Sequence, residues 1–342
     1  MMDQALIAAQ QSTAVSFLDP VSNDTAYRYS RHETRDSEQH AESLTDWDQT
    51  YSQVSAGNFR GEVVDIGFLG LQVFRETTNQ AVHQQGRPMA DCHVIGVPLS
   101  MSGPGLFSRQ QFGRDHVVTC SGNESFSMTT PEQFDVLAVT VPRSRLKKLL
   151  ALESEHEGFT DQPCVLRPAQ ECITTLRNCL TSLLDPAEFD GALLRNHQIQ
   201  RIMASAVMSS VVSTLMSARP AEDPNRSFRA RSHMVKGIVD WVMSRPEDPP
   251  TIEEICLQFN IGRRLLNYSF QEVLGTNPLS YLRSMRLNAV RRELRKGDTT
   301  IAVKDVAARW GFWHLPRFSN EYRKLFGELP SETLRHSARL MV

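Results

Sequence analysis

Basic and aromatic side chains are concentrated near the C-terminus, in the stretch RWGFWHLPRFSNEYRKLFGELPSETLR at residues 309–335. Trp310, Phe312 and Trp313 come directly before a segment in which bases alternate with apolar residues. Apolar residues at three- and four-residue steps favour one buried helix face, which leaves the bases on the opposite face. Lysine and arginine there are suited to contact phosphates. We expect Trp310 and Phe312 in the core, and Trp313, at the helix start, either in the core or against a deoxyribose.

The same pattern occurs a second time, farther upstream. IEEICLQFNIGRRLLNYSFQEVLGTNP at 252–278 aligns with VKDVAARWGFWHLPRFSNEYRKLFGELP at 303–330, first at an offset of 51 residues and then, after one inserted residue, at 52. An internal repeat of this kind predicts two copies of one structural unit. The matched pairs are Ile255 and Val306, Cys256 and Ala307, Asn260 and Gly311, Ile261 and Phe312, Leu266 and Phe318, Phe270 and Tyr322, Gly275 and Gly327, and Pro278 and Pro330.

Each copy has the sequence features of a helix-turn-helix. Asn260 in the first copy and Gly311 in the second follow a short helical pattern, and both residue types tolerate the left-handed backbone of a tight turn. Gly275 and Gly327 then mark the ends of the second helices, and a proline follows each of them. Between the copies, residues 279–297 predict one long basic helix that joins the two units.

Charge is distributed unevenly along the 342 residues. Residues 226–342 hold 20 Lys and Arg against 12 Asp and Glu, a net charge of +8, whereas the remainder of the chain carries −10. A basic part joined to an acidic part indicates a polyanionic partner for one half of the chain only.

The residues before the basic part predict a mixed architecture. Short β-branched and aromatic runs fill residues 58–141, which favours a small β-barrel or sandwich, and helical patterns follow at 170–184 and 189–218. We therefore expect an α+β chain. Its expected parts are a polar, loosely ordered segment at 1–43, a sensor and dimerisation domain at 44–216, a linker at 217–227, and an all-α domain with two helix-turn-helix units at 228–342.

Several other classes of protein are disfavoured. The six cysteines lack paired spacing, which is typical of unpaired thiols in a reducing cytoplasm, and no apolar run predicts a membrane span. A DNA-repair methyltransferase needs four clustered cysteines near its start, and a cupin-like enzyme needs a His/Glu cluster in its strands. His83, His93 and His116 are too scattered for such a metal site. We therefore expect no enzyme activity, no catalytic residue, no metal and no cofactor.

The last third of the chain resembles the AraC/XylS family of transcriptional regulators, and most closely the branch of the ethanolamine-operon regulator. The resemblance lies in RRLLNYSFQEVLGTNPLSYLRSMRLNAVRREL and VKDVAARWGFWHLPRFSNEYRKLFGELPSETL, which are long and specific motifs. A weaker likeness to the sensor half of that branch lies in DWDQTYSQVSAGNFRGEV at 46–63 and FRET at 74–77. Two positions depart from the family, because Asn260 replaces the usual turn glycine and Pro316 stands where Gly or Ser is usual.

This resemblance implies two recognition helices that enter successive major grooves of double-stranded DNA. Base contacts come from the exposed face early in each helix, where arginine suits guanine and Asn or Gln suits adenine, while other bases fix the register through phosphates. Carried over position by position, the DNA-binding residues of the first unit are Arg263, Arg264, Asn267, Tyr268 and Gln271. Those of the second unit are His314, Leu315, Pro316, Ser319 and Asn320, with Arg317, Arg323 and Lys324 assigned to phosphate.

Together these features predict a bacterial DNA-binding regulator, most simply a cytoplasmic, nucleoid-associated activator that forms a homodimer and, as the family implies, acts on RNA polymerase. A small molecule bound in the N-terminal domain is the expected control, and the sequence does not name it. The alternative is a constitutive DNA-binding regulator whose N-terminal domain only dimerises. An apolar stripe expected to serve both the core and a dimer seam contains Met203, Val207, Val211 and Leu215.

Overall fold

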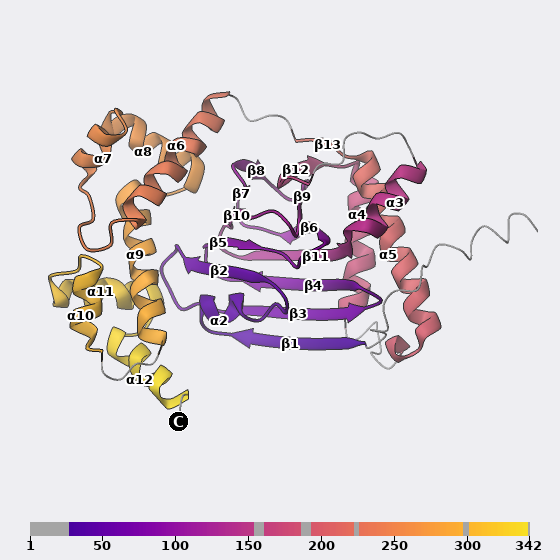
Figure 1. Cartoon of the computed structure of the whole chain (residues 1–342), viewed down its shortest axis with the longest axis horizontal. Coiled ribbons are helices and arrows are strands. Elements are labelled where there is room, and N and C mark those ends of the chain that lie inside the picture. The colour runs from indigo at the N-terminus through magenta and orange to yellow at the C-terminus, as the bar shows by residue number, and fades with distance from the viewer. Residues whose placement is uncertain (1–26, 154–160, 186–192, 222–225, 297–300, 341–342) are drawn as a thin grey trace, which may run out of the picture.

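A strand-rich part and a helical part lie side by side in the structure, a computed structural model that describes residues 27–153, 161–185, 193–221, 226–296 and 301–340. In Figure 1 the strands occupy the middle of the molecule, three helices cover one side of them, and the C-terminal helices stand on the other side. The expected mixture of a sheet-rich N-terminal region and a helical C-terminal region is confirmed.

The described strands form two antiparallel sheets. The larger sheet has the strand order β1-β3-β4-β11-β6-β9-β12-β13, and the smaller one has the order β2-β5-β10-β7-β8. The strands are β1 (Arg28–Thr34), β2 (Asp48–Gln53), β3 (Gly61–Phe68), β4 (Leu71–Thr78), β5 (Val82–Arg87), β6 (Cys92–Ser100), β7 (Gly105–Phe107), β8 (Gln110–Phe112), β9 (Val117–Ser121), β10 (Phe126–Thr129), β11 (Phe134–Pro142), β12 (Cys164–Arg167) and β13 (Arg219–Pro220).

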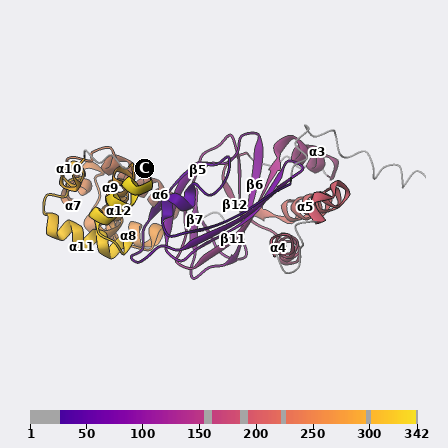
Figure 2. The same cartoon turned by 90° about the horizontal axis from the view of Figure 1, so that it is seen from below.

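Neither sheet closes on itself within the part of the chain that the structure describes. The larger order ends at β1 and β13, and the smaller one ends at β2 and β8, so the closed barrel that was one of two expectations is not formed. Helices cover the outer face of the larger sheet (Figure 2). The central strands β6 and β11 are therefore buried on both faces along most of their length.

Helices α3 (Arg143–Glu153), α4 (Gln170–Leu184) and α5 (His197–Ser217) provide this cover, with the short helix η1 (Leu193–Arg195) before α5. Val207 and Val211 of α5 are fully buried in the core of the larger sheet, as expected. By length and composition alone, α5 is also the one described helix that would suffice to cross a membrane. Its valines instead pack against the sheet in this structure.

The C-terminal helices include two helix pairs (Figure 1). The first pair is α7 (Ile252–Gln258) with α8 (Arg263–Leu274), and the second is α10 (Val303–Arg309) with α11 (Leu315–Phe326). The long helix α9 (Pro278–Arg295) lies between the pairs. Helix starts differ by 51 residues between the first members of the pairs and by 52 between the second members, which matches the sequence repeat. Capping residues define where two of these helices begin. Thr251 and Glu254 form a capping box at one start, and Asn277 caps the helix that begins at Pro278. The helices are α6 (Arg226–Met243), α7 (Ile252–Gln258), α8 (Arg263–Leu274), α9 (Pro278–Arg295), α10 (Val303–Arg309), α11 (Leu315–Phe326) and α12 (Pro330–Leu340).

The turn residues predicted from the repeat have the predicted backbone. Asn260 and Gly311, between the helices of each pair, have φ angles of 50° and 74°. Gly275 and Gly327 end α8 and α11 with φ angles of 69° and 78°. All four residues therefore lie in the left-handed region that glycine and asparagine tolerate best.

Two of the expected segments lie only partly within the described residues. The segment 1–43 was expected to be loosely ordered, but β1 and the short helix α2 (Ser37–Ala41) lie within it, and residues 1–26 are outside the described residues. Asp36 caps α2 by accepting hydrogen bonds from the backbone of Glu38 and Gln39. Residues 222–225 of the expected linker are also outside the described residues, and the domain boundaries remain a prediction.

The turn geometry makes a testable prediction at Gly311. A Cβ atom there would lie 2.5 Å from Cγ of Pro249 in addition to adopting a positive φ, so we expect Gly311→Ala to lower the free energy of unfolding by more than the roughly 1–2 kcal/mol of backbone strain. Gly275→Ala is the matched control, because it has a similar φ but open space around it. Urea denaturation followed by helical circular dichroism measures both. Equal losses in the two variants would contradict the packing shown at Gly311.

Candidate DNA-binding surface

Helix α8 separates a buried face from an exposed polar one. Leu266 and Phe270 are fully buried in the core of the first helix pair, and Val273 is buried beside them. Helical periodicity then turns the intervening positions outward. The exposed residues of α8 include all five that the resemblance assigned to DNA in the first unit: Arg263, Arg264, Asn267, Tyr268 and Gln271.

Two of these five side chains already have partners within the protein. Arg263 forms an ion pair with Glu253 of α7. The hydroxyl of Tyr268 donates to Oε1 of Glu272 at 3.3 Å, and the guanidinium of Arg231 lies 5.2 Å from the centre of the tyrosine ring. Because Arg231 also pairs with Glu272, Tyr268 is held in one orientation on the surface.

Arg264, Asn267 and Gln271 are different. Within the described part of the chain, no hydrogen bond or ion pair engages their side chains, and all three are exposed. They follow one another along a single face of α8 at three- and four-residue spacing. Their donors and acceptors are therefore free to meet base edges.

The corresponding face of α11 is less polar. His314 caps the helix by accepting a hydrogen bond at Nδ1 from the backbone of Arg317, and Leu315 and Pro316 begin the helix and are exposed. Arg317 pairs with Glu321 one turn later, with Nε and Oε1 2.9 Å apart. The start of α11 thus presents apolar surface and a paired base.

Farther along α11, the predicted residues divide by exposure. Asn320, Arg323 and Lys324 are exposed, and no ion pair engages them among the described residues. Ser319 is only half-buried and lies nearer the core side, next to the fully buried Phe318. Of the eight positions predicted in the second unit, Ser319 is therefore the one least available to a ligand at the surface.

The aromatic residues before α11 differ in exposure. Phe312 is buried, and its ring centre lies 5.1 Å from that of Phe318. Trp310 packs against the same core and donates from Nε1 to Oε1 of Glu293 at 2.7 Å. Trp313, by contrast, is 75% exposed at the mouth of the helix, so it is free to lie against a sugar.

Helix α9 connects the two helix pairs by belonging to both cores. Tyr281 and Met285 in its first half pack with α6, α7 and α8. Val290 and Leu294 in its second half pack with α10, α11 and α12. Since one continuous helix of 18 residues serves both cores, it fixes α8 and α11 relative to each other.

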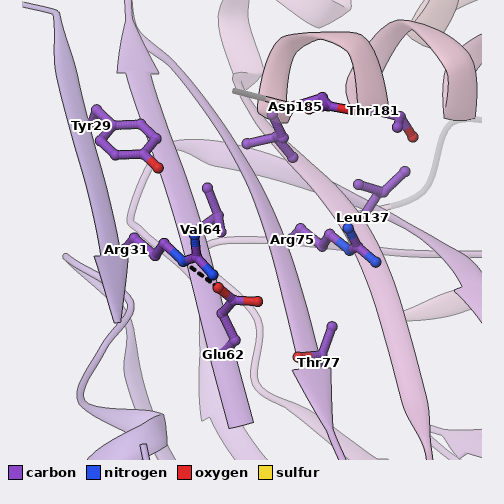
Figure 3. Close-up of a pocket in the computed structure, with 10 residues that line it drawn as sticks. Tyr29, Arg31, Glu62, Val64, Arg75, Thr77, Leu137, Thr181 and Asp185 are labelled. Carbon is purple, nitrogen blue, oxygen red and sulfur yellow. Dashed lines mark ion pairs between the residues drawn. The ribbon is translucent and has the colours of Figure 1, made fainter. Parts of the chain in front are cut away.

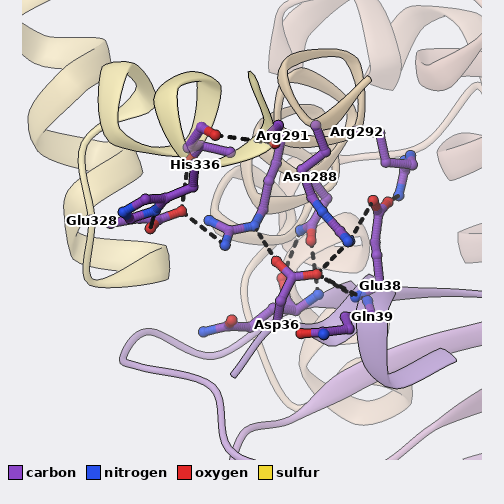
Figure 4. Close-up of polar contacts among 12 residues, drawn as sticks. Asp36, Glu38, Gln39, Asn288, Arg291, Arg292, Glu328 and His336 are labelled. Carbon is purple, nitrogen blue, oxygen red and sulfur yellow. Dashed lines mark hydrogen bonds and ion pairs between the residues drawn. The ribbon is translucent and has the colours of Figure 1, made fainter. Parts of the chain in front are cut away.

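A cluster of ion pairs joins the N-terminal domain to α9 (Figure 4). Nε of Arg291 lies 2.6 Å from Oδ2 of Asp36, and its Nη2 lies 2.9 Å from Oε1 of Glu328. Arg295 pairs with Asp36 at 2.5 Å and with Glu38 at 3.4 Å. These contacts join α2 of the N-terminal domain to α9 and to the segment between α11 and α12.

Burial and neighbouring charge oppose each other in this cluster. Burial by itself raises the pKa of Asp36, but the guanidinium groups of Arg291 and Arg295 outweigh it and hold that pKa below its ordinary value. For Glu38 the balance is reversed, since burial raises its pKa more than Arg292 lowers it. Asp36 is therefore the carboxylate whose charge contributes most to this contact.

Neutral hydrogen bonds extend the same contact. The side-chain amide of Asn288 on α9 accepts from the backbone N–H of Gln53 at 2.9 Å and donates to the backbone carbonyl of Gln53 at 2.8 Å. Gln53, at the end of β2, in turn donates from its side chain to the carbonyl of Leu325 in α11 at 2.7 Å. The end of β2 thus contacts both α9 and α11.

No sequence pattern predicts this interface. The basic residues of 279–297 indicate only a joining helix, whereas the structure pairs Arg291, Arg292 and Arg295 with α2. The partners lie more than 250 residues apart along the chain, so no local spacing indicates them.

A pocket of about 200 Å³ lies between the larger sheet and α4 (Figure 3). Its charged side chains are already neutralised: Arg31 pairs with Glu62, and Nη2 of Arg75 lies 2.7 Å from Oδ2 of Asp135. The hydrogen bond that Arg75 donates to the carboxylate of Asp135 raises the pKa of Arg75. This pocket therefore offers little room and no free charge to a ligand.

Comparison with known proteins supports the DNA-binding assignment. A helix-turn-helix domain family matches residues 255–336, which span both helix pairs. The probable thc operon regulatory protein of Rhodococcus erythropolis is 35% identical over 210 residues, which are 60% of this chain and 63% of that protein, slightly less than two thirds of its length. XylDLEGF operon transcriptional activator 3 of Pseudomonas putida is 26% identical over 273 residues, covering 78% of this chain and 80% of the activator.

Among solved structures, the AraC-like transcriptional activator CuxR is 15% identical with a TM-score of 0.40, covering 82% of this chain and all of CuxR. Residues 255–336 match a helix-turn-helix domain family, and both sequence relatives are named as regulators of operons, so this chain resembles DNA-binding transcriptional regulators. These two sequence relatives are named for the thc and xyl operons, so a place in the ethanolamine-operon branch stays a prediction.

The ion cluster makes a prediction about pH. Because the pKa of Asp36 lies below its ordinary value of 3.8, the ionised carboxylate stabilises the folded state above about pH 4, and this stabilisation is lost as the pH falls through the folded-state pKa. We expect Asp36→Asn to cost about 1–3 kcal/mol of unfolding free energy at neutral pH and progressively less below pH 4.

Glu33→Gln is the matched control for this measurement, since Glu33 pairs with Arg31 at 3.5 Å on the surface with 77% of its side chain exposed. Its effect is expected to stay within about 0.5 kcal/mol at every pH. Denaturant titrations of both variants across the pH range provide the test. A loss at Asp36 that is independent of pH would rule out a charge-based contact.

Proposed function

We propose that the protein regulates transcription by binding DNA in a sequence-specific manner, with α8 and α11 in two successive major grooves. The observation that carries this proposal is the pair of exposed helix faces held by one shared helix, α9. Its 18 residues correspond to about 27 Å, a length that suits two groove entries about one helical turn apart. The net charge of +8 on residues 226–342 favours DNA as the partner.

Base recognition is assigned to the free polar residues of α8. Arg264 can bind guanine with two hydrogen bonds, and Asn267 and Gln271 can bind adenine. Arg263 and Tyr268 are assigned to the edge of this surface, since each already has a partner within the protein.

The second helix is assigned fewer base contacts and more backbone contacts. Leu315 and Pro316 suit the methyl groups of thymine, with His314 and Asn320 beside them as polar contacts. Arg323 and Lys324 are assigned to phosphates, and Arg317 joins them if its pair with Glu321 opens on DNA. Ser319 is the least favoured DNA contact of α11 because its side chain is half-buried.

The sign and setting of regulation are proposed from the relatives. Several of them are named transcriptional activators, so we assign activation, acting on RNA polymerase, to this chain as well. Such a protein works in the cytoplasm, at the nucleoid. Control by a small ligand in the N-terminal domain is the favoured form, and a constitutive regulator is the second candidate. A thermal-shift screen of small molecules on the full chain separates the two, since only the first gains stability from a ligand.

A homodimer through α5 is also part of the proposal. Val207 and Val211 are buried in the core and so are not available to a second copy. Ile202, on the outer side of the same helix, is 57% exposed. An exposed isoleucine on a helix at the molecular surface is available to a second copy. Light scattering of the full chain tests this assignment, and a monomer at all accessible concentrations would reject it.

The DNA contacts predict two distinct mutant phenotypes. Arg264→Ala is expected to weaken binding to a specific site by about 1–3 kcal/mol and to relax sequence preference, because a base contact is lost. Lys324→Ala is expected to weaken specific and random DNA alike and to reduce the salt dependence by about one unit of log-log slope. Competition gel shifts with the full chain at several salt concentrations measure both. If Arg264→Ala weakened all DNA alike and Lys324→Ala relaxed sequence preference, Arg264 would be the phosphate contact and Lys324 the base contact.

A further inference from the structure

A cavity of about 990 Å³ lies between the smaller sheet and the helices α6, α8 and α9. Figure 1 shows these helices facing β5, β7 and β10 across the boundary between the two halves of the molecule. Both halves therefore contribute walls: β5 and β10 from the N-terminal side, and α6 and α9 from the C-terminal side. The cavity is much larger than the pocket beneath α4.

Two buried polar atoms at this cavity have no hydrogen-bond partner in the described protein. One is Nε2 of His83 on β5, whose residue is 8% exposed, and the other is Oγ of Ser232 on α6, whose residue is 2% exposed. A buried polar group left without a partner costs about 1–3 kcal/mol. The two groups belong to residues that line one cavity, one from each half of the chain, and a hydrogen-bonding molecule that reached them there would complete them.

The surroundings of His83 fix the kind of hydrogen-bonding group that fits. Nδ1 lies 3.0 Å from Oγ1 of Thr129, and the ring meets that of Tyr281 edge to face, with centres 6.1 Å apart. Burial lowers the pKa of His83 to about 4, with Asp240 and Lys236 exerting smaller, opposite effects, so the imidazole is neutral near pH 7. A neutral imidazole and a hydroxyl suit an uncharged head group, because a buried ion would lack a counter-charge.

The remaining walls support an amphipathic occupant without net charge. Apolar side chains face the cavity from both halves of the molecule. At the rim, two exposed arginines are balanced by two acids, and Lys236 pairs with Asp240 at 2.5 Å. The apolar residues are Leu106, Val235, Val239 and Val273, and the balanced rim residues are Arg87, Arg109, Asp48 and Glu124.

We propose that this cavity binds a small, uncharged amphipathic molecule whose polar head bonds to His83 and Ser232 and whose body packs on the valines of α6. The inference rests on the proposed ligand-controlled function and gives the effector a place at the junction of the two halves. A molecule there contacts β5 and α6 at once. Binding therefore stabilises the docked arrangement in which β2 and α2 hold α9.

The test uses the full chain and three uncharged probes, benzamide, benzyl alcohol and indole, with benzoate as the charged counterpart of benzamide. At millimolar concentration, at least one uncharged probe is expected to raise the melting temperature, and benzamide is expected to bind more tightly than benzoate in calorimetry. No shift with any of the three uncharged probes, or tighter binding of benzoate, overturns the proposal.

Variants separate a ligand contact from a structural role. Ser232→Ala removes a hydroxyl that has no partner, so the melting temperature without probe is expected to stay the same or rise while probe affinity falls about fivefold. His83→Leu is the second variant, expected to lose probe affinity to a similar degree. Ser244→Ala, at an exposed serine just after α6, is the control expected to bind as the unaltered chain does. Unchanged affinity in both cavity variants overturns the assignment.

Gel shifts on the same preparations keep this proposal distinct from the proposed function. DNA binding without probe binding rejects the cavity site alone. Probe binding that depends on Ser232 and His83, with no binding of any DNA, supports the cavity site and rejects the regulator function.

Discussion

Helix α9 is attached to both C-terminal helix cores and to the N-terminal domain, and the arrangement of the rest of the molecule depends on these three attachments. Tyr281 and Met285 belong to the core of the first helix pair, and Val290 and Leu294 to the core of the second. Its arginines and Asn288 meet the N-terminal domain. Because a single helix cannot bend far without breaking its own hydrogen bonds, these three attachments give α8, α11 and the N-terminal domain one common frame.

The attachment to the N-terminal domain differs in kind from the other two. The helix pairs hold α9 by apolar burial, which is non-directional and hard to undo. The contact with α2 and β2 is made mostly of ion pairs and amide hydrogen bonds, which require specific geometry and lose strength when water or salt enters. Asp36 links the two ends of this contact, since the same carboxylate caps α2 and pairs with Arg291. A junction built this way requires specific geometry.

The sequence predicted the C-terminal half better than the N-terminal half for physical reasons. Helix turns and caps are local, so Asn260, Gly311, Gly275 and Gly327 could be assigned their backbone from the repeat alone. Sheet closure depends on which distant strands pair, and short apolar runs do not encode that, so an open pair of sheets was not distinguished from a barrel. The same limit applies to Arg291 and Asp36, and to His83 and Ser232, which only the fold brings together. Ser319 shows that a position carried over from a family motif can be half-buried, because the motif does not tell how exposed a side chain is.

The central claim is that α9 holds α8 and α11 so that one chain occupies two successive major grooves. Hydroxyl-radical footprinting of the full chain on a site selected from random DNA tests this most directly. We predict two protected segments for each bound chain, on one face of the duplex and about one helical turn apart, with no palindrome between them. Protection of a single groove by each chain, or a requirement for an inner palindrome, would contradict it.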